Sequence, residues 1–295
     1  MTDLTVLREI DPTARIAPDA KVGLFGVIGP HVTVGPGTVV GRRVTILGHT
    51  MLGSGNVIGE GSVLGAAPQD LKYAGGPTVL RVGHRNHFGR EVTAHIGTEA
   101  GGGLTRIGDD NVLMDGCHVA HDCFVDDRTH LGQSVLLAGH IRIHSGARIE
   151  DLSGIHHFVT VGRYSLVGAH TPVRRDVPPF TEFRSFDHDW QSPPAVVGIH
   201  EAGIAAANLP AEQEKELRFA LKELFDDEST LQTKIEQLMN MGVEGEAAQL
   251  CEFCLRSLQG LFGRCREAFR GKPPPEARRQ AGRGRINSEG RYHEL

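Results

Sequence analysis

The sequence has few of the large side chains that fill thick hydrophobic cores. Only 5% of its 295 residues are aromatic, and there is a single Trp. Glycine is frequent, at 38 residues. Large aromatic side chains fill wide cores, whereas glycine permits tight backbone turns. This combination favours a thin, tightly turning core over thick layers.

Other features that the sequence lacks limit the class of protein. The five cysteines form no paired framework, and the N-terminal residues lack the basic and apolar regions of a signal peptide. No apolar run approaches membrane-spanning length. The net charge of −5 is close to neutral for this length. We therefore expect a reduced, cytoplasmic protein with no membrane span and no nucleic-acid partner.

The sequence instead has a six-residue period. Every sixth residue from Ile107 to Val173 is Ile, Leu or Val, and a similar ladder runs from Ile10 to Leu64. Helices and ordinary strands have periods of 3.6 and two residues, so neither explains this pattern. The six-residue period predicts an all-β coil of short strands, in which one aliphatic residue per side points into a narrow core.

Two insertions interrupt the coil, which we expect to occupy residues 1–179. Residues 65–81 and about 97–106 break the ladder with glycine and proline, and they are expected to form loops. Gly101–Gly103 give only weak support for a phosphate-binding loop, because neither a P-loop lysine nor a helix follows them. Pro178 and Pro179 are expected to close the coil, since proline cannot donate a sheet hydrogen bond.

The period becomes helical after a linker predicted at 180–209. A helical domain is expected over 210–270, with Pro210 in the first turn, Ser229 capping a second helix, and a third helix from about 246 to 269. Cys251 and Cys254 lie in this third helix without another Cys or His pair, so we assign them to the core. Residues 271–295 are rich in Pro, Gly and Arg and are expected to be disordered.

Histidines gather around three aliphatic residues of the long ladder. With three six-residue sides per turn, residues 18 apart stack on neighbouring coils about 4.8 Å apart. Val119, Leu137 and Ile155 then share one sheet. The histidines beside them would form a stripe along one edge: His118, His121, His140, His156 and His157. The alternative interpretation is a set of exposed polar rim residues.

The chemistry that these residues favour is acyl transfer to a hydroxyl. His121 with Asp122 can act as a general base, because the carboxylate fixes the imidazole tautomer. The backbone N–H of Gly139 can stabilise an oxyanion. The hydroxyl would then attack a thioester directly, without a covalent enzyme intermediate. Cys123 is a possible nucleophile, but it falls at an inward position and we assign it to the core.

Six segments occur in an order that resembles a known family. They are Gln69–Gly75, Gly101–Thr105, His118–Cys123, Leu137–His140, Ile155-His156 with Phe158, and Asp176–Pro179. Over residues 8–180 the chain resembles the UDP-N-acetylglucosamine acyltransferases that begin lipid A synthesis. The resemblance implies a left-handed parallel β-helix, a C-terminal α-helical domain and a homotrimer with active sites between subunits. It also implies that acyl carrier protein donates a 3-hydroxyacyl chain to the glucosamine 3-hydroxyl, with no cofactor.

The resemblance assigns roles by matched motif. His121 would be the general base, Asp122 its orienting partner and Gly139 the oxyanion donor. Gly168 and Ala169 match the region that gauges acyl length, where Ala169 in place of glycine favours a slightly shorter or shifted chain. The remaining residues would bind substrate, with Lys72 as a fixed positive charge: Gln69, Asp70, Lys72, His118, His140, His156 and His157.

Two departures from the family leave the acceptor open. The family usually has a basic run after the linker, whereas residues 198–207 contain no Lys or Arg, and the glutamine after the last site histidine is His157. A related acyltransferase with another amino sugar or another acceptor is therefore an alternative. A β-helical zinc carbonic anhydrase would need a ligand spacing that His118 and His121 do not clearly supply, so we predict no metal. A non-catalytic scaffold trimer would leave the His121–Asp122 pair and the Lys72 loop unexplained.

Overall fold

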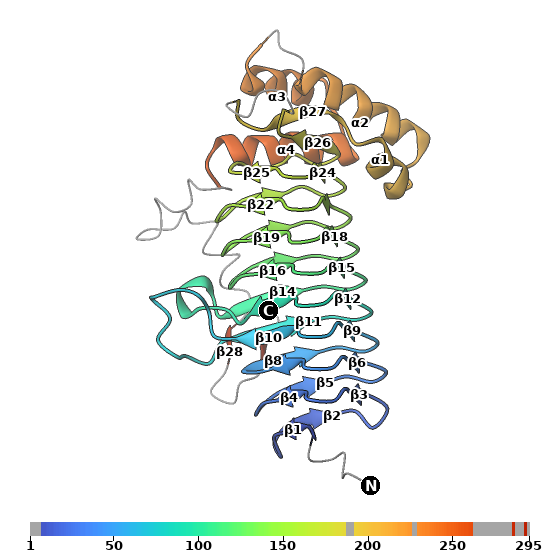
Figure 1. The fold of residues 1–295 in the computed structure, drawn as a ribbon. Coiled ribbons are helices and arrows are strands. Elements are labelled where there is room, and N and C mark those ends of the chain that lie inside the picture. Colours follow the sequence, from blue (N-terminus) through green and yellow to red (C-terminus); the bar gives the residue numbers. More distant parts are fainter. Residues whose placement is uncertain (1–6, 187–191, 226–228, 262–284, 287–291, 294–295) are drawn as a thin grey trace.

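The computed structural model describes residues 7–186, 192–225, 229–261, 285–286 and 292–293. The six-residue repeats form a tall coil of short parallel strands, with helices packed across its C-terminal end (Figure 1). Each turn of the coil contributes one strand to each of three sheets, which we call the first, second and third sheet. The predicted all-β coil followed by helices is confirmed.

The described strands of each sheet follow one another along the coil axis. The first sheet contains β1 (Glu9–Ile10), β4 (Val27–Ile28), β7 (Thr45–Ile46), β10 (Val63–Ala66), β13 (Thr93–His95), β16 (His118–Val119), β19 (Leu136–Leu137), β22 (Gly154–Ile155) and β25 (Pro172–Val173). The second contains β2 (Arg15–Ile16), β5 (Thr33–Val34), β8 (His49–Leu52), β11 (Val79–Val82), β14 (Leu104–Ile107), β17 (Phe124–Val125), β20 (Arg142–Ile143) and β23 (Thr160–Val161). The third contains β3 (Lys21–Val22), β6 (Val39–Val40), β9 (Val57–Ile58), β12 (His87–Phe88), β15 (Val112–Leu113), β18 (His130–Leu131), β21 (Arg148–Ile149), β24 (Leu166–Val167), β26 (Thr181–Arg184) and β27 (Ala195–Ile199).

The six-residue ladder forms the core of the coil. Val119 pairs with Leu137 and Leu137 with Ile155, so these residues share the first sheet as predicted. All three side chains are buried. The residues before them, His118, Leu136 and Gly154, pair in the same register and face outward. One side chain per strand therefore fills the core, while its neighbour forms the outer surface.

Both insertions are shorter than predicted. β11 begins at Val79 and pairs with β8 and β14, so the first loop ends near residue 78 rather than 81. β14 begins at Leu104, so the second loop covers 96–103 and contains the 3₁₀ turn η2 (Glu99–Gly101). Leu80 and Leu104 are buried. Burial of these apolar side chains favours the longer strands β11 and β14, which exceed the two-residue strands of the regular repeat.

The coil continues past Pro179, and the linker predicted at 180–209 is wrong. β26 pairs in parallel with β24, and β27 then pairs antiparallel with β26. Helix α1 (Glu201–Ala207) follows. Phe180 and Phe183 are buried, and burial of these rings favours continued strand pairing over an extended linker. The two prolines occupy the corner before the last strand of the coil rather than its end.

Three longer helices complete the fold: α2 (Ala211–Leu224), α3 (Leu231–Asn240) and α4 (Gly245–Leu258). Thr230, rather than Ser229, caps α3, because its hydroxyl accepts a hydrogen bond from the Thr233 N–H at 3.3 Å. The third helix was predicted to reach 269, but α4 ends at Leu258, and residues 262–269 lie outside the described part. None of the described helices combines the length and apolar character that a bilayer span requires.

The ends of the helical region bear on two further predictions. Cys251 and Cys254 are buried in α4 as free thiols, and burial raises the pKa of Cys254 to about 12. They are core residues, as predicted. Of the segment 271–295, only β28 (Arg285–Ile286) and β29 (Tyr292–His293) are described, and they pair antiparallel. The predicted disorder of the rest lies outside the described residues.

Candidate active site

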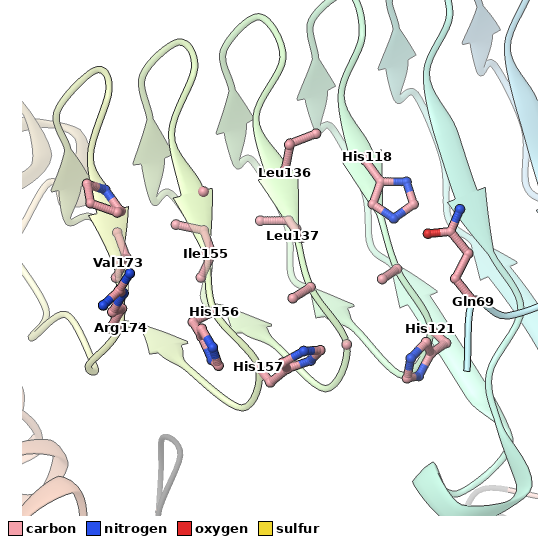
Figure 2. Close-up of a pocket in the computed structure, with 15 residues that line it drawn as sticks. Gln69, His118, His121, Leu136, Leu137, Ile155, His156, His157, Val173 and Arg174 are labelled. Carbon is pink, nitrogen blue, oxygen red and sulfur yellow. The ribbon is translucent and has the colours of Figure 1, made fainter. Parts of the chain in front are cut away.

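A groove of about 480 Å³ runs along the outer face of the first sheet, at its corner with the second sheet (Figure 2). Leu136, Gly154 and Pro172, at the outward positions of three consecutive strands, line its apolar part. Figure 2 shows His121, His157, His156 and Arg174 in a row along the edge, with His118 on the strand face and Gln69 beside it. The coil thus brings together histidines that are almost 40 residues apart in the chain.

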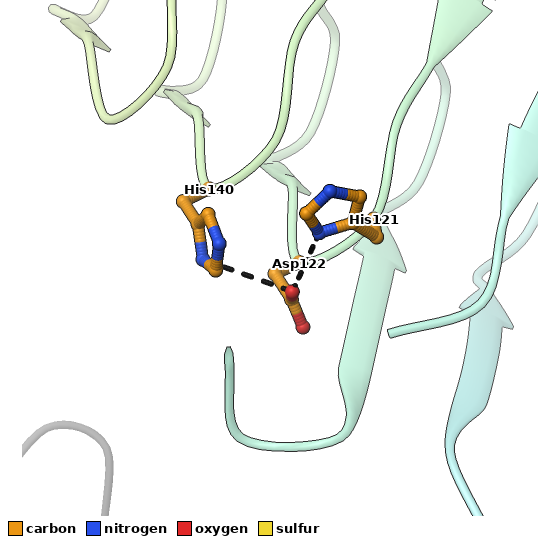
Figure 3. A group of neighbouring side chains, drawn as sticks. All are labelled: His121, Asp122 and His140. Atoms are coloured by element: carbon orange, nitrogen blue, oxygen red, sulfur yellow. Dashed lines mark hydrogen bonds and ion pairs between the residues drawn. The ribbon is translucent and has the colours of Figure 1, made fainter. Parts of the chain in front are cut away.

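His121 and Asp122 form a buried pair at the base of this edge (Figure 3). The imidazole Nδ1 lies 2.8 Å from Asp122 Oδ2. Because a carboxylate can only accept, Nδ1 carries the hydrogen, and Nε2 is left with its lone pair. Only 7% of the His121 side chain and 1% of the Asp122 side chain are exposed. The predicted pairing of these two residues is present in the structure.

Thr98 and Gly101 of the second insertion and Thr105 of β14 hold Asp122 in place. The Thr98 N–H donates to Oδ1 at 2.8 Å, and the Thr98 hydroxyl donates to Oδ2 at 2.6 Å. The Asp122 N–H donates to Thr105 Oγ1 at 2.8 Å. A Cβ at Gly101 would lie 2.0 Å from the Asp122 carboxyl carbon, so glycine is needed there. The glycine loop that sequence analysis weakly linked to phosphate instead closes over the carboxylate.

Gly139 and His140 come from the next coil. A Cβ at Gly139 would lie 2.8 Å from His121 Nε2, so the backbone of residue 139 passes directly beside the candidate base. The Gly139 N–H has no acceptor among the described residues. His140 Nδ1 is 3.7 Å from Asp122 Oδ2, and its ring stacks on Phe158 with centroids 4.6 Å apart. His140 therefore lies near the Asp122 carboxylate and does not line the groove.

His118 and a histidine that sequence analysis missed, His95, extend the row toward the N-terminus. The two rings meet edge to face at 5.0 Å, and Thr93 Oγ1 lies 2.6 Å from His118 Nδ1. Burial, together with the charge of His121, lowers the pKa of His118. Burial lowers the pKa of His95 to about 4, and its buried Nδ1 has no partner among the described residues. His95 lies outside the six-residue ladder beside an insertion, and only its place in the fold reveals it.

Only some of the remaining predicted site residues line the groove. Gln69 lies next to His118 and His121 in the groove (Figure 2). Asp70 and Lys72 do not line it. The Asp70 carboxylate accepts the Lys72 N–H at 2.9 Å, and the Lys72 side chain is exposed. Gly168 and Ala169 lie at the corner that precedes β25 and are not among the groove residues of a single subunit.

A metal ion fits the site poorly as built. His121, Asp122 and His140 each offer a ligand atom, and these atoms lie within 4.8 Å of one another. Both Asp122 oxygens, however, already accept hydrogen bonds, one from the Thr98 N–H and two from the Thr98 hydroxyl and His121. A metal bound by His121 Nδ1 and Asp122 Oδ2 would have to replace the hydrogen that these two atoms share. The three-histidine zinc site of the carbonic anhydrase alternative also differs from this set, which includes a carboxylate.

Comparisons with known proteins agree with these features. A Thiobacillus denitrificans protein named acyl-[acyl-carrier-protein]–UDP-N-acetylglucosamine O-acyltransferase is 40% identical over 254 residues, covering 86% of this chain and 96% of the relative. A Synechocystis relative of the same name is 39% identical over 177 residues. That match covers 60% of this chain and 62% of the relative, which is less than two thirds of its length. No protein-family profile matches the chain.

Solved structures agree with the sequence matches. The Moraxella catarrhalis UDP-N-acetylglucosamine O-acyltransferase superposes with a TM-score of 0.78 at 31% identity, covering 85% of this chain and 96% of that one. The Francisella novicida UDP-N-acetylglucosamine acyltransferase gives a TM-score of 0.78 at 26% identity, over 87% and 90% of the two chains.

Fold and site together define a left-handed parallel β-helix protein of the hexapeptide-repeat class, with a C-terminal helical domain. Within that class, the chain belongs to the family of acyl-[acyl-carrier-protein]–UDP-N-acetylglucosamine O-acyltransferases.

Proposed function

We propose that this chain transfers a 3-hydroxyacyl group from acyl carrier protein to the 3-hydroxyl of UDP-N-acetylglucosamine, the first step of lipid A biosynthesis. The observation that carries the proposal is the His121–Asp122 pair, 2.8 Å apart, at the base of an open groove and beside the Gly139 amide. The names of the relatives, acyl-[acyl-carrier-protein]–UDP-N-acetylglucosamine O-acyltransferases, support this choice of donor and acceptor.

In the proposed mechanism His121 acts as the general base. Its Nε2 accepts the proton of the sugar hydroxyl while the hydroxyl oxygen attacks the thioester carbonyl carbon. Asp122 holds the tautomer and stabilises the imidazolium that forms. The Gly139 N–H donates to the oxyanion of the tetrahedral intermediate. As the carbon–sulfur bond breaks, His121 returns the proton to the leaving thiolate, and an ester and a free thiol result.

Direct transfer fits the residues that line the groove. None of them is Ser, Thr, Cys, Tyr, Lys, Asp or Glu, so the groove lining offers no hydroxyl, thiol, amine or carboxylate to carry a covalent acyl intermediate. Cys123, the nearest thiol in sequence, is buried, and burial raises its pKa to about 12. A thiol held protonated in this way is a poor nucleophile.

We also propose that the working form is a cytoplasmic homotrimer in which Asp70 and Lys72 reach the groove of a neighbouring subunit. Their loop leaves the coil, and its apolar Leu71 is fully exposed in the single chain. Exposed apolar side chains beside a polar site are typical of subunit contacts. The free state of Cys117, Cys123, Cys251 and Cys254 is consistent with a reducing compartment.

Two features of the sequence favour an alternative acceptor. Residues 198–207 contain no Lys or Arg, and His157 stands where the family has glutamine, which together favour a different amino sugar. A panel assay distinguishes the two readings. Purified chain is incubated with 3-hydroxyacyl carrier proteins of several lengths and with UDP-N-acetylglucosamine or a UDP-linked amino sugar bearing a 3-amino group. Transfer to the first acceptor's 3-hydroxyl is expected, and exclusive transfer to the second would replace the proposal.

The same panel tests the acyl-length assignment of Gly168 and Ala169. Ala169 is exposed in the single chain, so its methyl would act only where a neighbouring subunit closes the groove. We expect Ala169→Gly to shift the preferred donor toward a longer chain. An unchanged preference would remove residue 169 from the length-determining region.

A further inference from the structure

Arg174 is the one formally charged side chain among the residues that line the groove. It directly follows β25, and the guanidinium has neither a hydrogen bond nor an ion pair within the described part of the chain. The lining includes no Asp or Glu to neutralise it. An arginine that lines a groove without a counter-ion creates a site for an anion.

Arg174 lies in the same row as His121, His157 and His156, at its far end (Figure 2). The His156 N–H donates to the Val173 carbonyl, so Arg174 stands one coil above His156. His121 lies three coil steps below Arg174, which is about 14 Å at the usual strand spacing. The positive charge is therefore well separated from the candidate general base.

Two imidazoles share this end of the groove with Arg174. The rings of His156 and His157 meet edge to face at 5.1 Å. The Nδ1 of His156 is buried and has no partner among the described residues, so contact with a ligand falls to the rest of the ring, which lines the groove. Arg174 and the two imidazoles thus line the same end of the groove.

The segment that follows the coil supplies no competing cation. The only ring nitrogens in residues 198–207 belong to His200, which is buried with its Nδ1 2.7 Å from the Tyr164 carbonyl. Ile204 of α1 is buried in the helical core. Arg218 of α2 forms an ion pair with Glu201 of this segment and another with Glu214. Residues 198–207 therefore offer the groove no Lys or Arg side chain.

We propose that Arg174, with His156 beside it, binds the diphosphate of the nucleotide-sugar acceptor and thereby sets its orientation along the groove. The inference rests on the proposed function, because that function supplies a diphosphate acceptor. A guanidinium binds phosphate oxygens in a bidentate manner. With the diphosphate at Arg174, the sugar extends back along the row toward His121. The donor's phosphopantetheine phosphate has the same chemistry, so the experiment separates the two sources.

The test measures UDP affinity by titration calorimetry, without acyl donor, in the full chain and in Arg174→Ala. Loss of a charge-assisted hydrogen bond should weaken UDP binding by roughly ten- to a hundredfold. Arg174→Lys should restore part of the affinity, because lysine keeps the charge but not the bidentate fork. The matched control is Arg175→Ala, which removes an exposed arginine next in sequence that does not line the groove.

Five outcomes test the inference and separate it from the proposed function. Weak UDP binding in R174A, with wild-type affinity in R175A and an unchanged KM for the acyl donor, supports it. Equal UDP affinity in wild type and R174A overturns it, as does a change confined to the donor KM. An R174A variant that only alters the oligomeric state assigns Arg174 to a subunit contact and also overturns it. A wild-type chain that binds UDP through Arg174 but transfers no acyl group to UDP-N-acetylglucosamine would refute the proposed function and not this site.

Discussion

Gly139 lies so close to the ring of His121 that no other residue fits at position 139. A Cβ there would be 2.6 Å from His121 Cε1 and 2.8 Å from Nε2, well inside van der Waals contact. The same proximity places the backbone of residue 139 beside Nε2, the nitrogen that we propose accepts the substrate proton. The proposed general base and the proposed oxyanion donor are thus fixed relative to each other by one contact between adjacent coils.

Gly139→Ala should therefore impair catalysis more than folding. The new methyl must push the His121 ring aside, and we expect kcat to fall by about 10²-fold or more. Steady-state kinetics at saturating acceptor measure the effect. Gly198→Ala is the control, because a Cβ at Gly198 meets nothing within 4 Å and the residue lies outside the groove. Wild-type kcat in G139A would show that the contact has no catalytic role.

Thr98 should act as a positioning residue through Asp122. Thr98→Val removes the hydroxyl that donates to Asp122 Oδ2 at 2.6 Å and accepts from the Gly101 N–H at 3.0 Å. We expect kcat to fall about tenfold, as for loss of one hydrogen bond to a charged group. The acceptor KM should stay near the wild-type value. Thr98→Ser, which keeps the hydroxyl, should retain most of the activity, and equal loss in both variants would point to packing instead.

The buried His95 should make the fold sensitive to acid. Burial lowers its pKa from 6.5 to about 4, so between these values the unfolded chain binds a proton that the folded chain does not. Stability is therefore lost as the pH falls below 6.5. Between pH 7 and pH 5 this one group should cost on the order of 2 kcal/mol of unfolding free energy. Urea unfolding of wild type and His95→Gln at both pH values measures it, and an identical pH dependence in both would contradict the assignment.

Removal of divalent metal should leave acyl transfer unchanged. Thr98 and His121 already donate hydrogen bonds to the Asp122 oxygens, and the proposed mechanism uses this pair without a metal ion. The assay compares enzyme dialysed against EDTA with untreated enzyme, and elemental analysis accompanies it. Activity that disappears on chelation and returns with zinc would revive the metal-dependent alternative.

Much of the fold could be predicted because the six-residue ladder is local. Each aliphatic residue of the ladder predicts the strand that contains it. A spacing of 18 residues predicts which strands stack on neighbouring coils. That arithmetic placed His118, His121 and His156 on one edge. It could not find β26, β27 or α1. Their formation depends on the burial of Phe180, Phe183 and Ile204, which the repeat pattern does not encode.

The parts of the site that sequence analysis missed all depend on the insertions. Thr98 and Thr105 contact Asp122 from 24 and 17 residues away, across a loop that breaks the ladder. Their contacts depend on how that loop folds back on the coil. His95 likewise precedes this insertion. The loop that carries Asp70 and Lys72 leaves the subunit's surface, so one chain alone does not show what these residues contact.

The rate of acyl transfer by His121→Ala tests the account most directly. Transfer from 3-hydroxyacyl carrier protein to UDP-N-acetylglucosamine is followed in a single turnover, beside a measurement of UDP affinity. Loss of a general base should slow the chemical step by about 10²- to 10⁴-fold. UDP should bind as in wild type, because the diphosphate site lies three coils away. A variant that transfers the acyl group at the wild-type rate would contradict the proposed mechanism.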